Sequence, residues 1–344
     1  MLTEESQLLI NSFLGKSNVQ SYIKDDHMKQ LYQSLSDKSF HTSKIELSQS
    51  QMNYPKSDFL VESLSKKLTE RKNVLTLKWK TMGKHSIHII LHIYLKDDED
   101  FPNTELLVKA ISFITSFSDR DRKITIHLCL LPDKKIIRKN QKKISKLSVN
   151  SGSNYFSDIE SEICVFRREE CIKVLFHEII HGLRFSNLNS HEKITERLCQ
   201  KYNLKSRDIL IDESYTEIWA KIMNCYFISS LTKSQTKFQH FCTMMTLEKE
   251  FSLYQANKVK QFVKKSNDKN LDQDTNVSAY FLVVGEISSN LKEFLKTCGI
   301  NPYLKDHNEC LDFILNQDTL ERRNISKKDI HYNTMRMSLI ELKV

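Results

Sequence analysis

Hydrophobic residues recur at two different spacings along the chain, and the order of these patterns predicts the secondary structure. Apolar residues that alternate with polar ones, or that run together over a few positions, predict strands. Met82-Gly83-Lys84 lies between the first two such runs and predicts a hairpin turn, and residues 104–117 have the apolar spacing of a helix. The predicted strands cover residues 74–79, 87–95, 124–131 and 162–166.

The two ends of the chain have helical spacing instead. In residues 1–70, apolar positions recur at intervals that place them on one face of a helix. They include Leu9, Phe13, Tyr22, Met28, Leu31, Leu35, Phe59, Leu60, Leu64 and Leu68. After residue 167 the pattern is mainly helical, with a polar connection at 264–276 and a further apolar helix that opens at Tyr280. Asn150-Ser151-Gly152-Ser153 predicts a turn before the last strand.

This order predicts an α+β protein with a helical region over residues 1–70 and a second region over 71–344. The second region begins with a sheet and the helix that follows it, residues 71–183, and continues as a helical part, residues 184–344. The chain contains only 6 glycines and 4 prolines, which favours long helices over many short strands. Its 344 residues are enough to bury a large core.

The charge of the chain narrows the classes of partner. The formal net charge is +9, and basic residues are densest in the segment 134–146. Such a segment could meet nucleic acid, an anionic membrane or an acidic substrate. Because it lacks interleaved aromatic residues, we expect a solvated loop and no nucleic-acid partner. We also expect no membrane span, because no apolar run reaches the required length.

The cysteines and the N-terminal residues indicate the cellular compartment that we expect for the protein. None of the 8 cysteines forms a Cys-x-x-Cys pair, so a structural zinc knuckle is not predicted. The chain opens without the basic and apolar regions of a signal peptide. We therefore expect reduced thiols in an intracellular compartment.

The strongest chemical signal is His177-Glu178-Ile179-Ile180-His181. Positions i and i+4 of a helix lie one above the other, so the two imidazoles share a face and can hold one Zn²⁺. Glu178 lies about 100° further round the helix, where it can take a proton from a water on the metal. Glu169 and Glu170 are expected in the first turn, where acids are favoured. Apolar residues on the other face predict a buried helix: Ile172, Leu175, Phe176, Ile179 and Leu183.

The surroundings of this motif resemble one group of zinc peptidases. A metzincin would carry a third histidine at position 187, which is Asn187 here, and His191 lies past the expected helix end. Instead the motif resembles that of gluzincins (thermolysin-like zinc peptidases), which have uncharged residues between and just around the two histidines. The matching residues are Val174, Leu175, Ile179, Ile180, Gly182 and Leu183.

The predicted third ligand comes from the segment that follows Asp212. Glu213 and Glu217 are four residues apart, so they stack on one helix face, where two like charges repel unless a cation lies beside them. In gluzincins one glutamate binds zinc, and an acid four residues later hydrogen-bonds a zinc-bound histidine. The resemblance therefore implies that Glu213 is the ligand and Glu217 the partner of His177. Glu217 departs from the most common pattern, which has aspartate at that position.

The resemblance also implies an architecture and an oxyanion donor. We expect a zincin-like domain of two lobes, a small mixed sheet with the active-site helix and then a mainly helical lobe, after a helical N-terminal extension. Gluzincins often use a tyrosine or histidine of the helical lobe to stabilise the oxyanion. Tyr280 is our candidate, because it follows a polar connection and begins an apolar helix. The alternatives are His307, His331 and Tyr215.

Parts of the chain are similar to uncharacterised zincin-like proteins of large DNA viruses. The residues that carry this similarity are Asn150-Ser151-Gly152, Phe166 to Glu170, Lys173-Val174, and Glu213-x-Tyr215-x-Glu217-x-Trp219-Ala220. If the protein is viral, the resemblance implies a place in the host cytoplasm or the virion.

These observations predict a zinc-dependent metallopeptidase with a polypeptide substrate. Zinc bound to His177, His181 and Glu213 would activate a water, and Glu178 would act as general base. One alternative is a zinc hydrolase of a non-peptide amide. Another is a non-catalytic zinc-binding structural or interaction protein, against which the intact Glu178 argues.

The first alternative, if it followed the deformylase type, would need a cysteine ligand. The cysteines nearest the motif are Cys164 and Cys171, which precede it on the predicted strand and helix. Both lie too close to the motif along the chain to fold back onto the metal easily.

Overall fold

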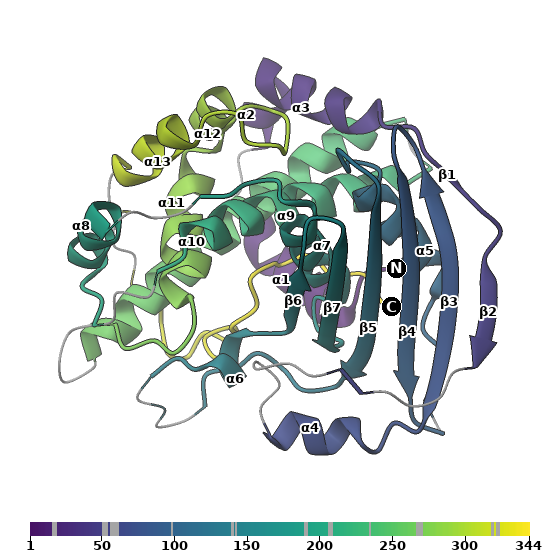
Figure 1. Ribbon diagram of the computed structural model, residues 1–344. Coiled ribbons are helices and arrows are strands. Elements are labelled where there is room, and N and C mark those ends of the chain that lie inside the picture. The colour runs from purple at the N-terminus through teal and green to yellow at the C-terminus, as the bar shows by residue number, and fades with distance from the viewer. Residues whose placement is uncertain are drawn as a thin grey trace. The chain divides into compact units, whose positions relative to one another are not determined.

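Figure 1 shows the computed structural model of the chain. It divides into two compact units. The sheet unit comprises residues 36–134, 150–184 and 341–344, and the helical unit comprises residues 1–35, 135–149 and 185–340. The structure describes residues 1–15, 19–49, 54–55, 62–97, 99–138, 141, 143–188, 192–205, 209–233, 235–265, 271–317, 320 and 324–344.

The sheet unit is built on one seven-stranded mixed sheet. Its strands are β1 (His41–Thr42), β2 (Glu46–Gln49), β3 (Asn73–Met82), β4 (Ser86–Leu95), β5 (Arg122–Leu131), β6 (Gly152–Phe156) and β7 (Glu160–Arg167). The order across the sheet is β1-β3-β4-β5-β7-β6, and β2 also pairs with β3. β4, β5 and β7 are parallel, whereas β3 and β6 run antiparallel to their neighbours β4 and β7.

Alternation of side chains along β4 explains why one face of the sheet is covered. Ile87, Ile89, Leu91 and Ile93 point to the same face and are almost completely buried. Helix α5 (Thr104–Thr115) makes the crossover between the parallel strands β4 and β5. It is packed on this face, where Trp79 Nε1 donates a hydrogen bond of 3.0 Å to Ser112 Oγ.

Two further helices lie in the described part of the sheet unit. Helix α7 (Cys171–Leu183) follows β7 and packs against α5, with the rings of Phe113 and Phe176 in edge contact at 6.0 Å. Helix α4 (Glu62–Leu68) contacts β5 and lies beyond the C-terminal ends of β4 and β5 in Figure 1.

Two long helices form the centre of the helical unit. These are α9 (Ile211–Ser230) and α10 (Lys237–Lys265), which pack against each other. Helix α1 (Glu4–Leu14) packs on α10, where the ring of Phe13 makes edge contacts with the rings of Phe251 and Tyr254. The remaining helices are α2 (Gln20–Ile23), α3 (Asp26–Ser36), α6 (Lys146–Val149), α8 (Glu192–Tyr202), the π-helix η1 (Ser278–Val283), α11 (Val284–Ser289), α12 (Leu291–Cys298) and α13 (His307–Leu315).

The structure confirms the α+β class, the four predicted strands, the β3–β4 hairpin and the helix near 104–117. The predicted turn at 150–153 is wrong in part, because Gly152 and Ser153 begin β6. The wholly helical character expected for residues 1–70 is also wrong, because β1 and β2 lie there. Phe59 and Leu60 lie outside the described residues. The proposed division at residue 70 stays a prediction.

The basic segment 134–146 is the solvated loop that we expected only in part: Lys134, Arg138 and Lys143 are exposed, but other residues of the segment are buried or paired. Lys135 is only 1 % exposed, and its carbonyl accepts a hydrogen bond of 2.7 Å from the backbone N–H of Met335. Ile144 forms a bridge to Gln273, and Lys143 lies 3.5 Å from a carboxylate oxygen of Asp274. The segment is therefore tied to other parts of the helical unit by backbone pairing.

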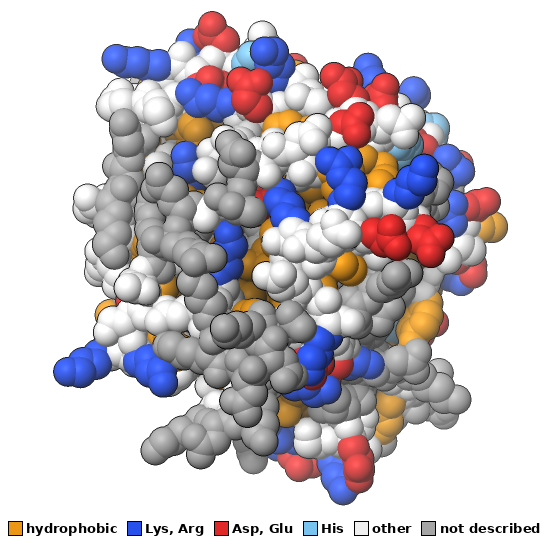
Figure 2. All heavy atoms as spheres, turned by 90° about the vertical axis from the view of Figure 1, so that its left-hand side faces the viewer, with side chains coloured by type: hydrophobic (Ala, Val, Ile, Leu, Met, Phe, Trp, Pro, Cys, Tyr) orange, Lys and Arg blue, Asp and Glu red, His pale blue; other side chains and the backbone are white. Residues whose placement is uncertain are grey.

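On the face shown in Figure 2, the described Lys and Arg side chains are interspersed with Asp and Glu and do not gather in one patch. Among the described helices, none is both long and apolar enough to cross a membrane.

Candidate metal centre

Helix α7 places the His-Glu-x-x-His motif within the sheet unit. The helix begins at Cys171, one residue after Glu170, whose backbone has a left-handed φ of 58°. Glu169 and Glu170 therefore precede the helix, and the prediction that they lie in its first turn is wrong. The backbone N–H of Glu170 donates a hydrogen bond of 2.9 Å to Oε1 of Glu341, near the end of the chain. All of the apolar residues predicted on the buried face of α7 are buried.

The two histidines of α7 converge on one point. The Nε2 atoms of His177 and His181 are 3.2 Å apart, and the ring centroids are 4.9 Å apart. Two nitrogens bound tetrahedrally to one Zn²⁺ at about 2.0–2.1 Å would be roughly 3.3 Å apart. The separation in the structure therefore fits two ligands of a single metal ion. His177 is buried, whereas His181 is partly exposed.

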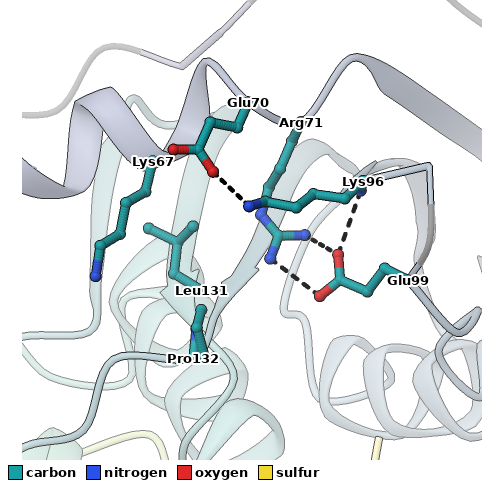
Figure 3. A pocket seen from close by; sticks show the side chains of 7 residues that line it. All are labelled: Lys67, Glu70, Arg71, Lys96, Glu99, Leu131 and Pro132. Carbon is teal, nitrogen blue, oxygen red and sulfur yellow. Dashed lines mark hydrogen bonds and ion pairs between the residues drawn. The ribbon is translucent and has the colours of Figure 1, made fainter.

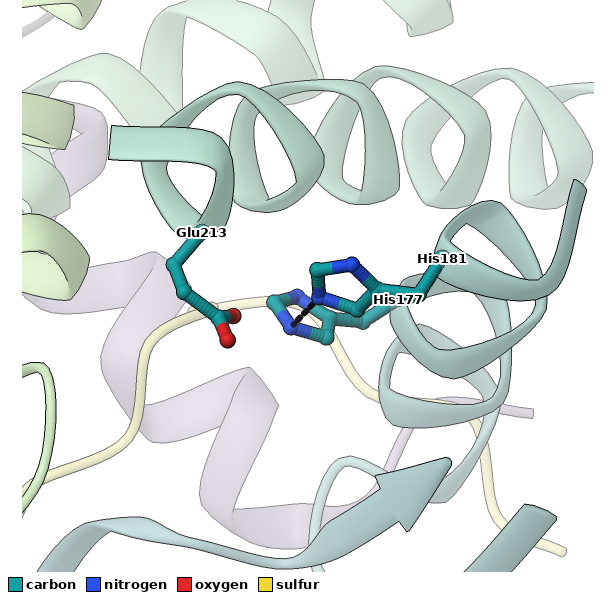
Figure 4. Close-up of side chains that lie close together, drawn as sticks. All are labelled: His177, His181 and Glu213. Atoms are coloured by element: carbon teal, nitrogen blue, oxygen red, sulfur yellow. Dashed lines mark hydrogen bonds between the residues drawn. The ribbon is translucent and has the colours of Figure 1, made fainter. Parts of the chain in front are cut away.

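A third side chain completes the candidate ligand set. One ligand atom each from His177, His181 and Glu213 lie within 4.8 Å of one another, so the three residues could hold a metal ion (Figure 4). Among the His, Cys, Asp and Glu residues that the structure describes, this group alone meets that criterion. Two imidazoles and one carboxylate suit zinc and leave a fourth position for water or substrate.

Glu213 lies in the first turn of α9 in the helical unit. The hydroxyl of Tyr280, on η1, donates a hydrogen bond of 3.1 Å to Oε2 of Glu213. Glu217 lies one turn further along α9 and is completely buried. The assignment of Glu217 as the partner of His177 stays a prediction.

The general-base candidate lies against the edge strand of the sheet. Glu178 is buried, with 7 % of its surface exposed. Its backbone carbonyl accepts a hydrogen bond of 2.7 Å from Nδ2 of Asn154 on β6, and its carboxyl group lies beside Gly152. Sequence reasoning missed both neighbours, because the turn predicted at 150–153 concealed the strand that carries them.

The other donor candidates are placed elsewhere within the helical unit. Tyr215 is buried, and its hydroxyl donates to the carbonyl of Pro302 at 2.9 Å. Nε2 of His331 lies 3.0 Å from the hydroxyl of Ser12, and His307 is an exposed residue in the first turn of α13. Tyr280, in contrast, contacts a candidate ligand directly. His191 lies outside the described residues.

The two cysteines nearest the motif have the environment of core residues. A hydrogen bond with Cys129, burial and nearby carboxylates raise the pKa of the Cys164 thiol well above its usual range. Burial and the charge of Glu341 raise the pKa of Cys171 to about 12. Neither cysteine belongs to the group of described residues that could hold a metal ion.

A separate pocket of about 380 Å³ lies within the sheet unit, beside α4 (Figure 3). Its charged side chains are paired with one another: the Arg71 guanidinium with Glu99, and Lys96 with Glu70. Lys67 forms an ion pair of 2.6 Å with Asp133. The charged side chains that line the pocket are therefore all held in ion pairs.

The chain matches no family model, no curated protein and no solved structure.

Proposed function

We propose that this protein is a zinc-dependent peptidase of the gluzincin type. The observation that carries the proposal is the convergence of the His177 and His181 Nε2 atoms to 3.2 Å, with Glu213 in the same ligand group. Glu178 lies between the two histidines in sequence, on the same helix.

Each side chain then has a distinct role. His177, His181 and Glu213 hold the ion, and a bound zinc ion would polarise the scissile carbonyl and acidify a water. Glu178 takes the proton from the attacking water and passes it to the leaving amine. Tyr280 turns its hydroxyl from Glu213 to the developing oxyanion.

The position of β6 supports a polypeptide substrate. β6 is the last strand of the sheet, and it pairs with β7 along one edge only within the described part of the unit. An extended peptide can add to such an edge through main-chain hydrogen bonds. Because Gly152 of β6 lies beside Glu178, a peptide paired with this strand would pass close to the base.

The proposal is tested by chelator-sensitive cleavage. Purified protein would be incubated with casein and with a peptide library derived from a proteome, and the products identified by mass spectrometry. We expect cleavage that stops when a chelator removes the metal and returns when Zn²⁺ is restored. Cleavage that persists without metal would contradict a metallopeptidase.

A panel of non-peptide amides, tested beside the peptides, separates the two alternatives. Hydrolysis of a non-peptide amide panel, with no peptide cleavage, would favour the first alternative. Bound zinc with no hydrolysis of either substrate set would favour a structural or interaction protein.

A further inference from the structure

The glycine at position 152 is explained by the side chain of Glu178. Gly152 begins β6 opposite Val165 of β7, and its φ lies outside the left-handed range that favours glycine. A Cβ atom on Gly152 would lie 2.6 Å from Oε1 of Glu178, 2.9 Å from its Cγ and 3.0 Å from its Cδ. Cβ atoms essentially never approach other atoms this closely. The carboxyl group of Glu178 can therefore occupy its place only because residue 152 has no side chain.

Asn154 makes a second contact from the same strand. Residues 152 and 154 project to the same face of β6, because side chains of a strand alternate. Nδ2 of Asn154 donates to the backbone carbonyl of Glu178 at 2.7 Å. Gly182 leaves room for this amide, because a Cβ there would lie only 3.1 Å from the Asn154 nitrogen. β6 thus contacts Glu178 at its carboxyl group and at its backbone.

We propose that Gly152 and Asn154 are positioning residues for Glu178. This inference rests on the proposed function, in which Glu178 is the general base. A base acts only within about 2.6–3.2 Å of the atom that carries the proton. A misplacement of about 1 Å can lower a rate about 100-fold. Gly152 sets how closely the carboxyl group approaches β6, and Asn154 fixes the helix turn from which the side chain extends.

The kinetic consequence is specific to the chemical step. Gly152→Ala should lower kcat by about 10–100-fold and change KM by no more than about twofold, because the base is displaced. Zinc content should not change, because the ligands are other residues. Asn154→Ala should lower kcat in the same direction. The matched control is Gly285→Ala, whose Cβ would lie 2.7 Å from Cβ of Ala256; it should lower stability without changing kcat.

A cycle of unfolding measurements tests the contact without any assay of activity. Gly152→Ala would be made in the wild-type chain and in the Glu178→Ala background, and thermal unfolding followed in both with chelator present. We expect the midpoint to fall only when Glu178 is intact. Without the Glu178 side chain the overlap is absent. Replacement of glycine by alanine then only lowers the conformational entropy of the unfolded chain, which should leave the midpoint unchanged or raise it. An equal fall in both backgrounds would overturn the proposal.

A kinetic cycle tests the role in positioning. Glu178→Gln preserves the atoms that Gly152 faces but removes the base. In that background Gly152→Ala should cause no further loss of kcat, whereas a full additional loss would overturn the role. If Gly152→Ala alone does not fold, recovery of folding by Glu178→Ala supports the contact and failure to recover contradicts it. If wild-type protein hydrolyses nothing, the proposed function fails while the unfolding cycle still decides the contact.

Discussion

Tyr280→Phe separates the hydrogen bond that the structure shows for the Tyr280 hydroxyl from the oxyanion role that we propose for it. The substitution keeps the ring and removes only the oxygen that donates to Glu213 at 3.1 Å. If the hydroxyl orients Glu213, its loss weakens zinc binding. If it also stabilises the oxyanion, its loss slows the reaction even when zinc is saturating.

The geometry sets the size of the first effect. Strong O–H···O⁻ bonds are about 2.5–2.7 Å long, so the bond at 3.1 Å belongs at the weaker end of the range for charged acceptors. A hydrogen bond at the weaker end contributes about 1.5 kcal/mol, so its loss corresponds to about a tenfold loss of zinc affinity. Loss of an oxyanion donor lowers kcat by about 10²–10³-fold.

The assay measures both quantities on the same preparations. Zinc affinity would be measured by competition with a chromophoric chelator, and kcat/KM at saturating zinc on the best peptide from the library. Tyr215→Phe is the control: its hydroxyl donates to the Pro302 carbonyl at 2.9 Å. It should lose about 1 kcal/mol of stability and leave zinc affinity and kcat/KM unchanged.

Either role can be refuted separately. Wild-type kcat/KM for Tyr280→Phe at saturating zinc would exclude Tyr280 as the oxyanion donor. Unchanged zinc affinity would show that its hydrogen bond to Glu213 does not orient the ligand.

Three other predictions follow from the same structure. His177→Ala and His181→Ala should each lower zinc content and the unfolding temperature together, and full occupancy in either variant would exclude that residue as a ligand. Glu213→Ala should release the metal, whereas Glu217→Ala should weaken zinc affinity about 10–100-fold; the reverse result in a metal titration would exchange their roles. Burial lowers the pKa of Lys258 to about 7, so the unfolded chain binds the extra proton between about pH 7 and 10.5, and wild-type stability should rise with pH across that window. Lys258 Nζ also donates a hydrogen bond to the carbonyl of Thr334. Lys258→Met should therefore be more stable than wild type at pH 6, by on the order of 5 kcal/mol less the contribution of that hydrogen bond, and the difference should shrink towards pH 10 in chemical unfolding; a difference that does not vary with pH would contradict the shifted pKa.

The apolar strands of the sheet could be predicted because burial leaves a pattern in the sequence. β4 and β5 carry dense apolar runs, and both were predicted. β1 and β2 are exposed along their whole length, so no alternation indicates them, and only their pairing with β3 makes them strands. β6 has only five residues and begins with glycine, and it is a strand because it pairs with β7.

In the candidate site, too, the sequence predicts local features but not contacts between distant residues. The spacing of His177 and His181 is a local property of a helix, so the sequence was enough to predict that they converge. The contact between Tyr280 and Glu213 joins residues 67 positions apart, and no local pattern predicts its geometry. Gly152 stands in the sequence as a turn residue, and nothing local to it indicates its contact with Glu178.

The measurement that tests the central claim most directly combines metal analysis with peptide cleavage for wild type and Glu178→Gln. Both proteins should bind one zinc ion per chain, because residue 178 is not a ligand. Wild type should cleave peptides, and Glu178→Gln should cleave them at least about 100-fold more slowly, as expected for a missing general base. Equal cleavage by two zinc-loaded proteins would contradict the role of Glu178, and the absence of zinc from wild type would contradict the metal centre itself.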